Sequence, residues 1–340
     1  MRHRKIGTIL VGPLACLILV SASWRGWAWE AGVPSVQKRT AQGVAHYILA
    51  VRSDLLGDGE AAVRHYSEAA RRDPAAFAPR LRLGMEHARA GRYDRAVVEL
   101  EKASALAPED VQSRFFLALV YSAQKDFDKA NREYEEVLSR LVVQDPRNVE
   151  LFTYLAQLYL AQGNLLKAVE NFERVIALDG RDTESLFFVA AYYLDAGRRE
   201  DAIALFRKCI DADPFHDGCL NSLSYTYAQH GENLDEALAL VTRALEVRPD
   251  QAAYIDTLGW VYYQQGQYIE ALKEIGRADV LLKDPEIKDH LGDIYLKLGD
   301  VDMARRYWRL SLEEDPDQVA VRAKLNDLDI HHALQAETGP

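Results

Sequence analysis

Residues 252–316 decide the fold: AAYIDTLGWVYYQQGQYIEALKEIGRADVLLKDPEIKDHLGDIYLKLGDVDMARRYWRLSLEEDP. The stretch contains two similar halves. In each half a glycine (Gly259 or Gly292) is followed three residues later by a tyrosine (Tyr262 or Tyr295), then by a second glycine and an alanine. Because the two halves are 33 residues apart, the sequence indicates a structural repeat.

The same pattern extends toward the N-terminus at intervals of 33 to 38 residues. The apolar positions recur at helical spacing on two segments of about a dozen residues. A glycine between the segments permits a tight turn, and small residues let the two helices approach closely. Each unit is therefore expected to be a helix pair that buries its apolar face against neighbouring units. The small residues that mark the eight units are Ala50, Gly84, Ala118, Ala156, Ala190, Ser224, Gly259 and Gly292.

This pattern resembles the tetratricopeptide repeat family over residues 43–316. The resemblance implies an all-α fold, a right-handed superhelical solenoid of about eight helix pairs. Four extra residues before Pro146 are expected to lengthen one helix by about one turn. Residues 317–335 are expected to form a capping helix, followed by a tail at 336–340. Residues 23–42 lack periodicity and are predicted to be a linker.

The N-terminus is predicted to be a targeting segment. Basic residues precede an apolar run from Ile6 to Val20, and small residues follow it, which is typical of an export signal over residues 1–22. The run would span about 22 Å, less than the roughly 30 Å of a bilayer core. A retained anchor and a lipidated Cys16 stay open as alternatives. All three predict an exported protein, periplasmic or membrane-anchored and facing the periplasm, with membrane contact only through this segment.

Composition and motifs exclude several function classes. The 340 residues carry 41 basic and 52 acidic side chains, a net charge of −11, which argues against a nucleic-acid partner. No phosphate-binding loop, nucleophile elbow or zinc-protease helix is present in the sequence, so we expect no enzyme, no cofactor and no metal. The adjacent His331 and His332 are interpreted as a solvated tail, because adjacent residues do not share a helix face.

Cys209 and Cys219 allow two interpretations. They lie near the end of one helix and the start of the next, within reach of a disulfide, which an oxidising compartment would permit. Buried cysteine also packs as a small apolar residue. The sequence alone favours two buried free thiols.

The resemblance to the family places a binding groove on the first helix of each unit. Its first half is apolar and aromatic, its middle carries amides and its far end is acidic, with Lys297 as the base there. A partner segment would anchor apolar side chains in the first half and basic ones at the acidic end. Packing between repeats is the alternative role of the aromatic residues. The predicted groove residues are Tyr47, Leu81, Met85, Phe115, Leu119, Gln157, Phe187, Asn221, Tyr225, Asp256, Trp260, Asp289 and Asp293.

Residues 219–317 resemble a run found in exported bacterial tetratricopeptide proteins, among them lipoprotein adaptors of carboxyl-terminal-processing proteases. The resemblance implies a non-enzymatic scaffold or adaptor in the cell envelope whose partner is a protein, such as an envelope protease. A second hypothesis is an assembly factor for a pilus, secretion or polysaccharide-export machine. A third, of another class, is an enzyme with an unrecognised site in the groove.

Overall fold

The computed structural model describes residues 35–337, and the regular elements in that range are all α-helices. The all-α expectation is therefore confirmed. The helices are α1 (Ser35–Leu55), α2 (Gly59–Arg72), α3 (Phe77–Arg89), α4 (Tyr93–Leu106), α5 (Val111–Ala123), α6 (Phe127–Gln144), α7 (Val149–Ala161), α8 (Leu165–Leu178), α9 (Thr183–Asp195), α10 (Arg199–Ala212), α11 (Asp217–His230), α12 (Leu234–Val247), α13 (Ala252–Gln264), α14 (Tyr268–Leu281), α15 (Pro285–Lys297), α16 (Val301–Glu314) and α17 (Val319–Glu337).

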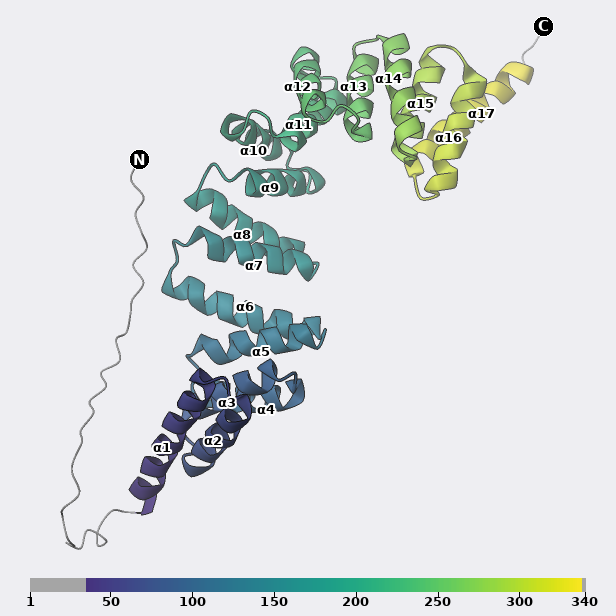
Figure 1. Ribbon diagram of the computed structural model, residues 1–340. Coiled ribbons are helices and arrows are strands. Elements are labelled where there is room, and N and C mark those ends of the chain that lie inside the picture. Colours follow the sequence, from purple (N-terminus) through teal and green to yellow (C-terminus); the bar gives the residue numbers. More distant parts are fainter. Residues whose placement is uncertain (1–34, 338–340) are drawn as a thin grey trace, which may run out of the picture. The chain divides into compact units, whose positions relative to one another are not determined.

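The described residues divide into two compact units, residues 35–109 with α1–α4 and residues 110–337 with α5–α17. Within each unit the helices pack as consecutive pairs, α1 with α2, α3 with α4 and so on to α15 with α16 (Figure 1). Each pair also contacts the next pair in its own unit, and α17 packs against α16. This is the repeat solenoid that the sequence predicts.

A left-handed backbone residue separates the two helices of each pair. Glycine takes this conformation in seven of the eight helix pairs, for example Gly266 with φ of 78° and Gly299 with φ of 85°. In the third pair, α5 with α6, Lys125 replaces the glycine and adopts the same conformation with φ of 62°. The turn geometry therefore persists where the favoured residue is missing, at the steric cost of a side chain with positive φ.

The core lies between the helices of a pair, where the small residue of the first helix meets a large residue of the second. Gly259 faces Ile275 and Gly292 faces Trp308 so closely that a methyl group on either glycine would overlap its neighbour. Ile275 and Trp308 are almost fully buried. The fixed alanines of the second helices are equally buried, with exposed fractions of 0 to 1%. Close packing of small against large residues thus sets the spacing of each pair.

The lengths of the helices follow the sequence with one correction. As predicted, α6 is longer than the other second helices, with 18 residues rather than 14. The linker predicted over residues 23–42 is wrong from residue 35 onward, because α1 begins at Ser35. Residues 35–42 are mostly good helix formers, and Gln42 accepts a hydrogen bond from Arg72 of α2.

The C-terminal helix covers the last pair. Val321 and Leu325 of α17 are buried against Ala304 and Trp308 of α16, as expected for a capping helix. It runs from Val319 to Glu337, slightly beyond the predicted end at 335. The export signal of residues 1–22 and its alternatives lie outside the described residues. Within residues 35–337, no helix is both long enough and apolar enough to span a bilayer.

Candidate functional site

In the first compact unit, which contains α1–α4, the three predicted groove residues differ in how deeply their side chains are buried. Tyr47 of α1 is half-buried, and its ring centroid lies 5.7 Å from that of Tyr66. Met85 of α3 is also half-buried. Leu81 is a core residue with an exposed fraction of 5%, so its assignment to a binding groove is wrong. It occupies the same place in its repeat as Tyr47, but its side chain is covered.

In the second unit, α5 presents the most accessible apolar side chains of the predicted groove. Phe115 is 43% exposed and Leu119, one helical turn later, is 41% exposed. The inner edge of Phe115 packs against Tyr134, with ring centroids 6.3 Å apart. Gln157 on α7 is exposed as well. These residues are free to contact a partner.

Phe187 of α9 has a packing role. Its ring centroid lies 6.2 Å from that of Phe206 and 5.5 Å from that of His216, so it fills the space between consecutive pairs. The side chain is half-buried. For this residue the contacts therefore match the packing alternative.

Asp256 and Trp260 of α13 form a cluster with His290 of α15, in which Asp256 and His290 are buried and Trp260 is half-buried. Both carboxylate oxygens of Asp256 lie 3.0 Å from His290 Nδ1, and the indole of Trp260 stacks on the imidazole with centroids 4.1 Å apart. Burial by itself lowers the pKa of His290, but the Asp256 carboxylate outweighs it, and the pKa of His290 is raised. With an exposed fraction of 6% and an internal partner, Asp256 is not the free acid that the sequence predicts.

A lysine of the same chain neutralises the aspartates at the acidic end of the predicted groove. Lys324 Nζ of α17 lies 2.7 Å from an oxygen of Asp289 and 2.7 Å from an oxygen of Asp293. Trp308 Nε1 also donates to Asp293 Oδ1, at 3.2 Å. Burial raises the pKa of Asp293, and Lys324 opposes that rise. The expectation that Asp289 and Asp293 await a basic partner is therefore corrected, because a lysine of the capping helix already occupies that place.

A hollow of about 160 Å³ lies between α11, α13 and the start of α15. The hydroxyl of Tyr225 on α11 donates to Glu286 of α15, and Gln229 Nε2 donates to that hydroxyl at 2.6 Å. Burial and the bond to Glu286 raise the pKa of Tyr225, which keeps the phenol protonated. Three of the predicted groove residues, Asn221, Tyr225 and Asp256, therefore line an open cavity. The residues around it are Asn221, Tyr225, Ala253, Asp256, Thr257, Leu282, Asp284, Glu286 and Ile287.

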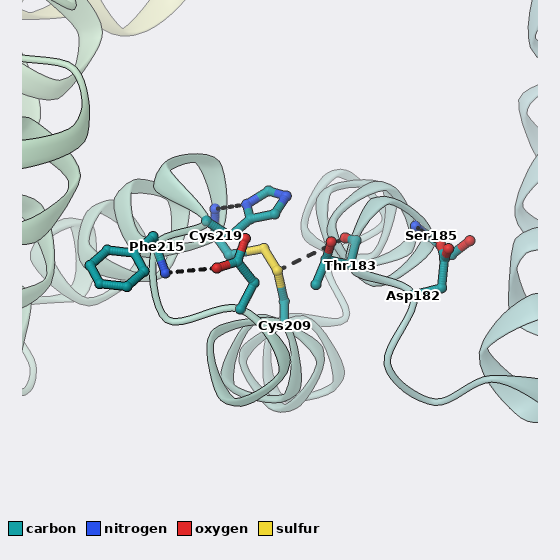
Figure 2. Close-up of a disulfide and its surroundings, with 8 residues drawn as sticks. Asp182, Thr183, Ser185, Cys209, Phe215 and Cys219 are labelled. Carbon is teal, nitrogen blue, oxygen red and sulfur yellow. Dashed lines mark hydrogen bonds between the residues drawn. A yellow bond between two sulfur atoms is a disulfide. The ribbon is translucent and has the colours of Figure 1, made fainter. Parts of the chain in front are cut away.

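A disulfide joins Cys209 of α10 to Cys219 of α11 (Figure 2). Their Cα atoms are 6.4 Å apart, and both residues are fully buried. The preference for two free thiols is therefore corrected, although the burial expected of them is present. His216 Nδ1 accepts a hydrogen bond from the backbone N–H of Cys219, which caps α11. A metal ion would bind Cys209 and Cys219 as thiolates, and the disulfide removes both thiolates.

Comparison with known families identifies the repeat. Three family models, each described as a tetratricopeptide repeat, match residues 56–103 and 153–217, residues 87–141, and residues 285–318. Together these ranges cover more than half of the chain. The chain belongs to the tetratricopeptide repeat family. Such repeat proteins use extended surfaces to bind protein partners, and the matching models do not describe an enzyme.

Curated relatives of this tetratricopeptide repeat protein are distant. The photosystem I assembly protein Ycf3 of Synechococcus sp. (strain CC9605) is 27% identical over 114 residues, which are 32% of this chain and 66% of Ycf3. DnaJ homolog subfamily C member 3 of Gallus gallus is 22% identical over 52% of this chain and 37% of its own length. The chain thus spans less than two thirds of the length of either relative.

One solved structure shares the fold. A chain of the APC/C heterotetramer Cut9–Hcn1 has a TM-score of 0.50 and 14% identity, over 79% of this chain and 52% of that one. The type IV pilus biogenesis factor PilW has a TM-score of 0.47 and 18% identity, over 63% of this chain and 98% of its own. At 14% identity, the similarity to the Cut9–Hcn1 complex concerns the fold alone.

Sequence reasoning missed three residues that shape the tetratricopeptide repeat surface: Glu286, His290 and Lys324. Each reaches a predicted groove residue from a later helix, at a separation of 61, 34 and 35 residues. A search one repeat onward from each predicted acid would have found the last two, because adjacent repeats place equivalent positions side by side.

Proposed function

We propose that the chain is a non-enzymatic scaffold that binds a polypeptide partner. The partner would lie along the first helices of the helix pairs in the second compact unit, which begins at residue 110. The observation that carries the proposal is the exposed pair Phe115 and Leu119, which lie one turn apart on α5. Aromatic and aliphatic side chains so placed anchor partner segments and contribute much of the binding energy. The exposed amide of Gln157 on α7, which takes the place of Leu119 in the next repeat, offers a polar contact.

We further propose an extracytoplasmic setting. The N-terminal pattern of residues 1–22 is that of an export signal. The buried disulfide between Cys209 and Cys219 supports this setting, since disulfides persist in oxidising compartments. In that setting the scaffold would deliver client proteins to an envelope protease or position them near it.

The alternative function is assembly of a multi-protein machine in the envelope. It is favoured by the similarity to Ycf3, whose name describes a photosystem I assembly protein. The two functions differ in the identity of the partner, so one capture experiment distinguishes them.

The test is affinity capture with crosslinking from an envelope extract of the host, using the full chain as bait. Replacing both Phe115 and Leu119 by alanine is expected to abolish recovery of the partner. The matched control replaces two residues of second helices that are more exposed, Phe127 (61% exposed) and Leu165 (52% exposed), and should leave recovery intact. A peptidase in the recovered fraction would favour the adaptor, and a machine component would favour assembly. Equal recovery by both variants would contradict binding through α5.

A further inference from the structure

The hollow between α11, α13 and the start of α15 is lined by Asn221, whose side-chain oxygen receives no hydrogen bond. Asn221 Oδ1 is buried, and it has no hydrogen-bond partner among the described residues. The nearby hydroxyls cannot serve it, because Tyr225 donates to Glu286 and Thr257 Oγ1 donates to the carbonyl of Ala253 at 2.9 Å. A buried acceptor left unpaired keeps the desolvation penalty that a hydrogen bond would offset, so an occupant that donates hydrogen bonds is favoured.

The charge of the hollow has one sign. Its lining contains the carboxylates of Asp256, Asp284 and Glu286, and no lysine or arginine belongs to the described residues that line it. His290 offsets Asp256, which leaves the charges of Asp284 and Glu286 facing the cavity. The occupant is therefore expected to be positively charged as well as a donor.

Helix capping explains only part of this arrangement. Asp284 Oδ1 accepts the backbone N–H of Glu286 at 2.8 Å, and acidic residues are favourable in the first turn of a helix. That accounts for two carboxylates at the start of α15. It does not account for the unpaired oxygen of Asn221, which comes from a different helix, or for the open volume between them.

We propose that this hollow binds an arginine or lysine side chain of the partner polypeptide, an inference that rests on the function proposed above. A guanidinium or ammonium group would pair with Glu286 at the opening, and a turn of the Asn221 amide toward the cavity would let the same group donate to Asn221 Oδ1. The aliphatic stem would lie against Leu282 and Ile287, which also line the cavity. The basic side chain thus enters between α11 and α15, and not at Asp289 and Asp293, where Lys324 already lies.

The experiment selects peptide ligands from a random library, so the partner need not be identified first. A phage library of random heptapeptides is panned against the immobilised full chain in a buffer that contains a chelator, and selected peptides are measured by calorimetry. We expect one position of the selected peptides to be arginine or lysine. Replacing that residue by norleucine should weaken binding about tenfold or more, and Glu286→Gln should do the same.

Two further variants separate this role from a structural one. Asn221→Asp adds a negative charge to the cavity and should tighten binding of the basic peptide several-fold. Glu200→Gln makes the same change as Glu286→Gln at a side chain 84% exposed on α10 and should have no effect. Circular dichroism confirms that each variant is folded.

Each result has a distinct meaning. Selected peptides without a shared basic position, or equal affinity for Glu286→Gln and the unchanged chain, would overturn the pocket while leaving partner binding intact. Failure to select any peptide would contradict both proposals. A rise in melting temperature with calcium chloride that Glu286→Gln abolishes, in place of peptide selection, would assign the cavity to a metal ion and overturn the basic-residue assignment.

Discussion

Replacing Gly292 by alanine tests the packing rule on which each repeat depends. An added Cβ atom would lie 2.4 Å from both Cδ1 and Nε1 of Trp308 and 2.9 Å from its Cγ. Normal contact between such atoms begins near 3.5 Å, so the ring must move by about 1 Å. Trp308 is only 1% exposed, and its Nε1 is held by Asp293, so no open space receives the displaced indole.

The magnitude follows from two opposed effects. Overpacking of a dense core costs about 1–3 kcal/mol, and a rigid buried indole places this site near the upper end. Alanine is better than glycine inside a helix by about 1 kcal/mol. Gly292→Ala is therefore expected to lower the free energy of unfolding by about 2 kcal/mol.

Gly276→Ala is the matched control. Gly276 also lies inside a helix, α14, but an added Cβ would meet nothing within 4 Å. Only the helix-propensity gain remains, so this variant should be more stable by about 0.5–1 kcal/mol. The same substitution is thus expected to lower the free energy of unfolding at one position of the chain and to raise it at another.

Urea unfolding followed by far-ultraviolet circular dichroism measures both variants. Because repeat arrays can unfold in parts, hydrogen exchange of amides in α15 and α16 provides a local readout. We expect faster exchange there for Gly292→Ala and unchanged or slower exchange for Gly276→Ala. Stabilisation by both substitutions would refute the packing argument, because propensity alone would then explain the glycine.

Three other outcomes are expected. Asp256→Asn should cost about 3–5 kcal/mol by leaving a buried imidazole without its carboxylate. Because the pKa of His290 is raised in the folded state, that loss is full below about pH 6.5 and shrinks as the pH rises through the folded value, and an unfolding series across pH checks the sign. Lys324→Met should cost about 1–2 kcal/mol and increase hydrogen exchange in α17, since it leaves two aspartates of α15 without a base; unchanged exchange would contradict the neutralisation. Alkylation of the unreduced protein should leave Cys209 and Cys219 unlabelled, and serine at both positions should cost about 2–3 kcal/mol in thermal unfolding; two labelled thiols would disprove the disulfide.

The sequence by itself determined the repeat, the helix pairs and their turns. These depend on residues close together in the chain: the small residue of a first helix, the glycine of the turn and the alanine of the second helix. Local periodicity therefore specified them, even the extra turn of α6. It misjudged the start of α1, because residues 35–42 form a helix without contributing to the repeat pattern.

The tertiary structure alone decided which predicted groove residues remain available. Phe115 and Leu119 are exposed, whereas Leu81 and Asp256 are buried. Asp256 acquires its partner from the next repeat, and the aspartates of α15 acquire theirs from the capping helix. Such contacts join residues one repeat apart, and they depend on how far each pair is rotated against the next. That rotation follows from packing between helices and is not encoded in the 34-residue period, so the period predicts where the surface lies while the stacked structure decides which of its charges are free.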